Sequence, residues 1–106
     1  MEELRIYQLA MEIGEIVWVQ VQKWGYFSKD TISKQLVKAA DSVASNLSEG
    51  FGRYFYKETK QFGYYLRGSL YETKTWLTKA HNRKLLNDEN FGILMKAINT
   101  IGKQLN

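Results

Sequence analysis

Apolar residues recur at steps of three and four along four segments of this 106-residue chain, and no proline interrupts any of them. That spacing is the period of an amphipathic helix that buries one face. Without proline, and with only eight glycines, the chain has little of the turn chemistry that a many-stranded β fold requires. The four segments predict helices over about residues 3–24, 29–50, 54–82 and 88–104. Their short connections favour an all-α fold, an antiparallel up-down-up-down four-helix bundle in one domain spanning residues 1–106.

The connections between these segments carry residues that end or start helices. Residues 25–28 interrupt the first apolar pattern, and Ser28 or Asp30 can cap the second helix by accepting backbone N–H bonds. The run Gly50-Phe51-Gly52 predicts the end of the second helix, because glycine readily takes the left-handed conformation that follows a helix. Asn87 is placed to cap the fourth helix.

Residue types that support catalysis or metal binding are scarce. The chain has no cysteine and a single histidine, His81, without an acidic residue at metal-ligand spacing. We expect His81 at the surface near the end of the third helix, where it can interact with the helix dipole. The sequence therefore predicts no enzymatic activity, no catalytic residue, no metal and no cofactor.

The sequence also lacks the usual signs of a membrane or secreted protein. No apolar run approaches the roughly 20 residues that span a bilayer. Glu2 and Glu3 stand where a secretory signal has basic residues, and the absence of cysteine agrees with a reducing compartment. We expect a cytoplasmic protein without a membrane partner.

Positive charge is concentrated in the third predicted helix. The formal net charge is +4, and residues 53–84 hold eight basic residues against Glu58 and Glu72. At about 100° per residue, seven basic and tyrosine side chains fall within one arc of about 100° opposite the apolar stripe, namely Arg53, Lys57, Lys60, Tyr64, Arg67, Tyr71 and Lys74. Because basic residues attract phosphates and exposed tyrosine rings stack on unpaired bases, this face predicts nucleic-acid binding. The alternative is a solvated helix face whose tyrosines cover neighbouring helices.

Polar residues flank the apolar stripes of the second and third helices. Ser42, Asn46 and Glu49 lie about one turn apart on the second helix, and Ser69 and Glu72 do so on the third. A carboxylate pair could perform acid–base chemistry, but no nucleophile, metal or oxyanion donor completes a site. We therefore expect a structural polar network that sets helix register, with Asn46, Ser69 and Glu72 at least partly buried and hydrogen-bonded.

The first helix is apolar over more than its core stripe. Tyr7, Met11 and Trp18, with Gly14 between them, form a second line about 100° away. A monomer seldom exposes a contiguous apolar patch of that size, so this line predicts a subunit interface in a homo-oligomer. The alternative is that Tyr7 and Trp18 widen the contact with the core.

Three stretches are similar to a known family. The four-helix-bundle family encoded in 23S ribosomal RNA intervening sequences has a second-helix signature that resembles residues 35–53, QLVKAADSVASNLSEGFGR. A third-helix element of that family resembles residues 66–73, LRGSLYET, and residues 6–10, IYQLA, fit its opening. The resemblance covers nearly the whole chain.

This resemblance implies an assembly and a set of residue roles. Members of the family resemble the accessory variability proteins of diversity-generating retroelements, which form pentameric, positively charged barrels that bind nucleic acid and a reverse transcriptase. The resemblance therefore implies a ring-shaped homopentamer. It implies ligand contact for Arg53 and Arg67, and structural roles for Ser42, Asn46, Glu49, Gly50, Gly68, Ser69 and Glu72. The family has no established single biochemical activity.

Two functions remain open at this point. The first is a non-enzymatic homo-oligomeric module that binds nucleic acid, with RNA favoured, through the basic-aromatic face of the third helix. The second is a pentameric interaction scaffold that docks a protein partner such as a reverse transcriptase. Salt-sensitive binding to RNA distinguishes the first from the second.

Overall fold

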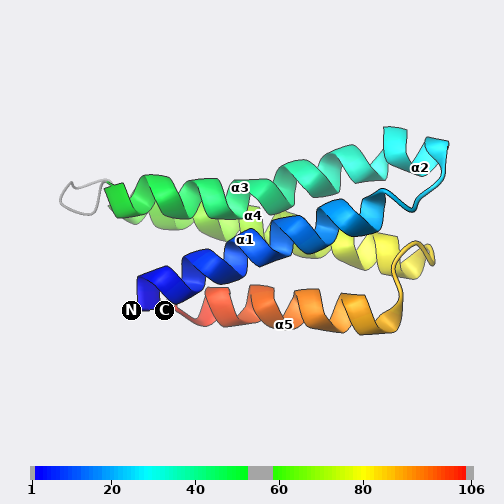
Figure 1. The fold of residues 1–106 in the computed structure, drawn as a ribbon. Coiled ribbons are helices and arrows are strands. Elements are labelled where there is room, and N and C mark those ends of the chain that lie inside the picture. The colour runs from blue at the N-terminus through cyan, green and yellow to red at the C-terminus, as the bar shows by residue number, and fades with distance from the viewer. Residues whose placement is uncertain (1, 53–58, 105–106) are drawn as a thin grey trace.

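The protein is an all-helical bundle with four long helices and one short one. The computed structural model describes residues 2–52 and 59–104. The elements are α1 (Glu2–Val21), α2 (Tyr26–Asp30), α3 (Ile32–Gly52), α4 (Thr59–Asn82) and α5 (Asp88–Gln104). Consecutive long helices run in opposite directions, and the start of α1 and the end of α5 lie at the same end of the bundle (Figure 1). The predicted all-α antiparallel bundle is confirmed.

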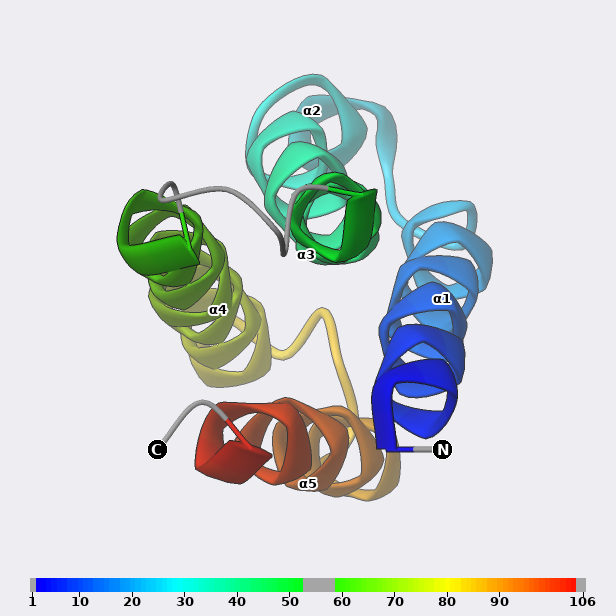
Figure 2. The same cartoon turned by 90° about the vertical axis from the view of Figure 1, so that its left-hand side faces the viewer.

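The long helices follow one another around the bundle in the order α1, α3, α4, α5 (Figure 2). Adjacent helices in this order pack against each other, and α5 closes the bundle by contacting both α1 and α4. The α1–α3 pair and the α4–α5 pair therefore form opposite sides of the molecule. A groove can therefore form between α1 and α3 on one side of the bundle, and another between α4 and α5 on the other side.

Much of the core comes from the apolar stripes that the sequence predicts, although Tyr65 of the predicted α4 stripe is 55% exposed and Leu70, outside that stripe, is buried. Each long helix contributes side chains that are almost completely inaccessible to water, among them Ile13, Leu36, Leu66, Leu77 and Leu94. Burial of one such side chain contributes about 1.5–3 kcal/mol. Because every long helix has one such face, no helix can leave the bundle without exposing apolar surface.

The connection between α1 and α3 differs from the prediction. Residues 25–28 were expected to form a non-helical connection, but most of them belong to the short helix α2. In this segment the Lys29 N–H donates to the Gly25 carbonyl oxygen (2.9 Å). Ser28 and Asp30 lie inside α2, so neither caps α3, which begins only at Ile32. A helix of five residues is too short to display an apolar period, and its local hydrogen bonds were therefore not visible in the pattern.

The turn between α4 and α5 contains the predicted cap. The backbone N–H of Asn90 donates to Oδ1 of Asn87 (2.8 Å), which confirms Asn87 as the cap of α5. Before it, Lys84 takes a left-handed conformation with φ of 62°. Leu85 N–H donates to the Ala80 carbonyl oxygen (2.9 Å) and Lys84 N–H to that of His81 (3.1 Å), the paired hydrogen bonds that close a helix C-terminus.

Candidate nucleic-acid interface

A groove with a volume of about 400 Å³ runs between α4 and α5. Among the described residues, its lining holds three cationic side chains and no acidic one, and includes Arg67, Leu70, Tyr71, Lys74, Ile98, Asn99, Gly102 and Lys103. We call this surface the basic groove. Leu70 and Ile98 are buried and form its apolar floor. Cations above an apolar floor suit a ligand with negative charge on one edge and a flat apolar ring on another.

The α4 side of the basic groove follows from helical spacing. Arg67, Tyr71 and Lys74 lie at steps of four and three, so their side chains share one face of α4. The Lys74 Nζ lies 5.8 Å from the centre of the Tyr71 ring, within the range of a cation–π interaction. The ring thus positions the ammonium group at the groove.

The α5 side contributes two residues that the sequence reasoning missed. Asn99 and Lys103 are one helical turn apart and both line the groove opposite Tyr71. The net charge of this segment did not point to them, because Lys96 and Lys103 are balanced by Asp88 and Glu89 along α5. A helical wheel of α5 places Asn99 and Lys103 on one face. It does not show that this face lies against α4.

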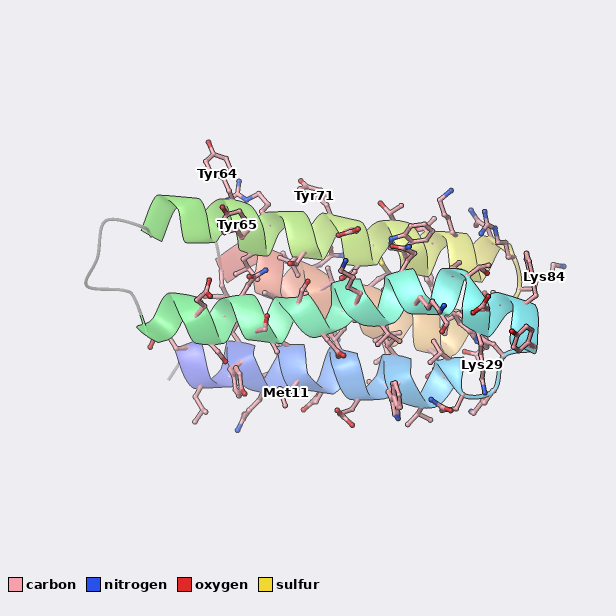
Figure 3. All side chains as sticks on the ribbon, turned by 90° about the horizontal axis from the view of Figure 1, so that it is seen from above. Met11, Lys29, Tyr64, Tyr65, Tyr71 and Lys84 are labelled. Carbon is pink, nitrogen blue, oxygen red and sulfur yellow. The ribbon has the colours of Figure 1, made fainter. Side chains whose placement is uncertain are left out.

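Two tyrosines of the predicted binding face, Tyr64 and Tyr71, are largely open to solvent. Tyr64 is 71% exposed and Tyr71 is 63% exposed. Both project from the side of α4 that faces away from α3, whereas Tyr65 lies on the α3 side (Figure 3). The open rings of Tyr64 and Tyr71 leave stacking surface for a ligand.

Three other residues of the predicted binding face are not placed by the structure. Arg53 and Lys57 lie outside the described residues, and Lys60 lies within α4 but its side chain is outside the description. The structure therefore brings together Arg67, Tyr71 and Lys74, with Tyr64 on the same side of α4.

A hydrogen-bonded cluster joins α3 to α4 beneath this surface. The Asn46 Nδ2 donates to Ser69 Oγ (2.7 Å) and to the Tyr65 carbonyl oxygen (3.3 Å). The Ser42 Oγ lies 2.8 Å from Ser69 Oγ and 2.7 Å from the Ala39 carbonyl oxygen. Because Ser69 is buried, sliding α3 along α4 would leave these polar groups without partners. Ser42, Asn46 and Ser69 are thus placed as a register-setting cluster requires.

Glu72 does not belong to this cluster. The side chain of Glu72 is exposed, and the expectation that it is partly buried is wrong for the single chain. The reason is rotational, since a step of three residues from Ser69 turns the side chain about 60° along the helix surface. Glu49 is also exposed.

A second groove, of about 410 Å³, lies between α1 and α3 on the opposite side of the bundle. In the part of the lining that the structure describes, two side chains are acidic and none is basic, and the residues are Tyr7, Ala10, Met11, Gly14, Glu15, Asp41, Ala44, Ser45 and Ser48. We call it the acidic groove. Tyr7 and Met11 of the predicted interface line it, whereas Trp18 lies farther along α1 and is 53% exposed.

The acidic groove is shaped by a close approach of α1 and α3. A Cβ atom on Gly14 would lie 2.8 Å from the Asp41 Oδ1, so the absence of a side chain at Gly14 makes room for this carboxylate. Burial raises the pKa of the Asp41 carboxyl above its ordinary value, and the negative charge of Glu15 raises it further. The groove thus disfavours additional negative charge.

His81 occupies the predicted place near the end of α4, where it ties α4 to α5. Its Nε2 lies 2.7 Å from the Asp88 Oδ1, and its ring stacks on Phe91 with centroids 4.1 Å apart. Within residues 2–52 and 59–104, no group of three or more acidic or histidine side chains is placed to hold a metal ion. No helix in that part of the chain is long and apolar enough to span a bilayer.

The comparison with known proteins supports the family resemblance that the motifs of α3 and α4 indicate. A search of curated proteins found no match. The family described as 23S rRNA-intervening sequence protein matches residues 2–106, which include both helices of the basic groove and both helices of the acidic groove. The chain therefore belongs to the 23S rRNA-intervening sequence protein family.

Proposed function

We propose that this protein is a non-enzymatic module that binds nucleic acid, RNA in preference to DNA, in the basic groove. The observation that carries the proposal is the groove's lining, in which Arg67, Lys74 and Lys103 converge from two helices and none of the other lining residues that the structure describes is acidic. Cations attract phosphates irrespective of sequence, and exposed tyrosine rings accept unpaired bases. RNA is the first ligand to test, because its loops, bulges and ends present unpaired bases that aromatic side chains can stack on.

Single-stranded RNA suits this groove better than a duplex. An A-form duplex keeps its bases stacked inside, where Tyr64 and Tyr71 cannot reach their faces. Unpaired bases can be splayed onto those rings while the phosphates contact the cations. Limited base readout is expected, with Asn99 as the one amide in the lining.

We also propose that the protein acts as a homo-oligomer, a pentameric ring being the form that the family resemblance favours. The supporting observation is the apolar surface of α1, where Leu4, Met11, Trp18 and Val19 are all exposed in the single chain. Burying this surface between copies removes it from water. A ring would also repeat the basic groove, so that the modest charge of one chain is multiplied.

The test is RNA binding measured against salt. Three phosphates held by three cations predict that log K falls with log salt with a slope of about −2 per chain, at roughly −0.7 per contact on a single strand. Arg67→Glu combined with Lys103→Glu should flatten that slope and weaken binding at least tenfold at low salt. The matched control, Arg5→Glu with Lys38→Glu, changes the net charge equally at exposed positions outside the groove lining.

Two outcomes would contradict the proposal. Equal loss in both double variants would show that net charge, not the groove, governs binding. No binding of wild-type protein to single-stranded or hairpin RNA at low salt would remove nucleic acid as the ligand. Light scattering on each variant is needed first, because a change in assembly would alter binding on its own.

A protein-interaction scaffold is the second candidate, and the exposed Met11 and Trp18 on α1 favour it. In that case the apolar line holds a protein partner, such as a reverse transcriptase, and contact with nucleic acid is incidental. The two candidates differ in their response to salt, since an apolar contact is insensitive to moderate salt whereas phosphate contacts are not.

A further inference from the structure

The end of the bundle opposite the chain termini holds a cavity of about 660 Å³. It lies where α1 ends and where α4 turns into α5, and its polar lining includes Gln20, Lys23, Asn82, Lys84 and Asn87. His81 and Asp88 also line it, but they are bonded to each other. Ammonium and amide groups around one cavity offer several donors to an oxygen-rich anion.

The backbone of Lys84 supports a use for its side chain. Its φ of 62° lies in the left-handed region, where this position after a helix usually holds glycine or asparagine. A long side chain there carries a conformational cost that glycine would avoid. The Lys84 side chain lines the cavity from this left-handed position, which places its ammonium group among the donors there.

Two aromatic side chains stand open at the same end. Tyr26 and Phe27 on α2 are 83% and 78% exposed, the highest values among the large apolar side chains of the described residues. They follow Lys23 by three and four residues, which keeps them within about 14 Å of it along the chain. Lys29 and Lys84 lie at this end as well (Figure 3).

Basic side chains gather at this end, where Asp88 is the acidic side chain among the described residues that line the cavity. Lys23, Lys29, Arg83 and Lys84 form no ion pair within the part of the chain that the structure describes. The one acidic residue of α2, Asp30, is held by Lys34 with Nζ and Oδ1 3.0 Å apart. Unpaired cations and exposed rings at one end of the bundle suit a partner that combines negative charge with flat apolar faces.

We infer that this end of the bundle is a second binding site for single-stranded nucleic acid, with Lys23 and Lys84 holding phosphate at the cavity and Tyr26 and Phe27 stacking on bases. The inference shares its ligand class with the proposed function but uses none of the residues of the basic groove. Eleven residues of α4 separate Tyr71 from Asn82, a rise of about 16 Å. One strand can therefore contact both sites.

An anionic membrane is the other surface that attracts lysines and aromatic rings. The structure favours nucleic acid, because the cavity at this end of the bundle is lined by the amides of Gln20, Asn82 and Asn87. Amides hydrogen-bond to phosphates and base edges, whereas a lipid contact requires a broad apolar face.

The experiment is photo-crosslinking of a single-stranded oligouridine RNA that carries 4-thiouridine, with the crosslinked residues identified by mass spectrometry. We expect crosslinks on α2 at Tyr26 or Phe27 in addition to those near Tyr71. Tyr26→Ala combined with Phe27→Ala should remove the α2 crosslinks and weaken binding by about 5- to 150-fold for each base that is no longer stacked.

Lys84→Gly tests the binding role of Lys84 without destabilising the fold. Glycine relieves the left-handed backbone, so the melting temperature should be equal to or above that of wild type. Loss of the ammonium group should nevertheless reduce the α2 crosslinks and lower the salt slope by about 0.7. Lys84→Arg, which keeps the charge, should retain the crosslinks.

The outcomes distinguish this site from the basic groove. Crosslinks on α2 that persist in Arg67→Glu with Lys103→Glu support an independent site. Crosslinks confined to α4 and α5 would overturn the second site and leave the basic groove intact. Binding to phosphatidylserine vesicles that depends on Tyr26 and Phe27, without RNA crosslinks on α2, would overturn it in favour of lipid. Absence of any crosslink at either site would overturn both.

Discussion

The two grooves of this bundle have nearly equal volumes, about 400 Å³ for the basic groove and about 410 Å³ for the acidic groove, but opposite charge. Arg67, Lys74 and Lys103 line the first, whereas Glu15 and Asp41 line the second. Both form where two neighbouring helices of the same bundle meet. The fold therefore supplies the shape on both sides, and the side chains decide which ligand each side accepts.

This difference assigns separate tasks to the two sides. A polyanion is attracted to the basic groove and repelled by the acidic groove. The acidic groove combines its carboxylates with Tyr7 and Met11 and with small residues that allow close approach, features that suit a protein surface. If the two sides act independently, a substitution on one side should leave the other side's binding unchanged.

The largest effect is expected for the apolar line beside the acidic groove. Trp18→Glu places a charge in the proposed subunit interface, so the assembly should fall from several times 12.4 kDa toward the mass of one chain. Light scattering measures this, and helical circular dichroism should be nearly unchanged. Ile93→Glu is the matched control, because Ile93 is similarly exposed on α5. A wild-type protein that is monomeric at micromolar concentration would remove the reason for this interface.

A smaller effect is expected at the cluster that joins the two sides. Ser69→Ala removes the acceptor of Asn46 Nδ2 and leaves a partly buried amide with a poorer partner, which costs about 1–3 kcal/mol of unfolding free energy. At roughly 4–8 °C per kcal/mol for a domain near this size, the melting temperature should drop measurably. Ser48→Ala, at an exposed position of α3, is the control. Equal stability of the two variants would show that the cluster does not hold α3 against α4.

The smallest effect is expected inside the acidic groove. The pKa of Asp41 is raised in the folded protein, so the folded state keeps its proton over a pH range in which the unfolded chain has lost it. Stability therefore decreases as pH rises through the folded pKa. Asp41→Asn removes this cost and should raise the melting temperature at pH 7 by at most a few degrees, because the side chain is still exposed.

The gain in Asp41→Asn should shrink as pH falls and disappear near about pH 3 and below, where the carboxyl is protonated in most molecules of both states. Thermal unfolding between pH 3 and pH 8 follows it, and Glu15→Gln should give part of the same gain. A variant that is less stable at pH 7 would show that the Asp41 carboxylate makes a favourable contact, as it would with a cation from a neighbouring copy.

The fold was largely predictable because long helices carry a periodic signal. The stripes with Ile13, Leu36, Leu77 and Leu94 are buried as expected, and α5 has the bounds predicted for it. The short helix α2 was missed because five residues do not complete an apolar period. Glu72 was misplaced because its spacing from Ser69 was read as a shared face, whereas about 60° of rotation is enough to reach the surface.

The candidate site was predictable on one helix and not on the other. Arg67, Tyr71 and Lys74 share a face of α4 through spacing alone. Asn99 and Lys103 enter the groove only because α5 packs beside α4. The basic end of the bundle was missed for the same reason, since Lys23 and Lys84 are 61 positions apart in the chain and meet only at the cavity.

By itself, the sequence determined which residues are buried, where the long helices lie and that positive charge gathers on α4, because each of these depends on spacing along one helix axis. Only the tertiary structure decided which faces of different helices meet. That choice placed α5 beside α4, Gly14 against Asp41 and Lys23 near Lys84. The physical reason is that helix packing is set by how side chains of separate helices interlock, and a periodic pattern records the direction of a side chain but not its neighbour.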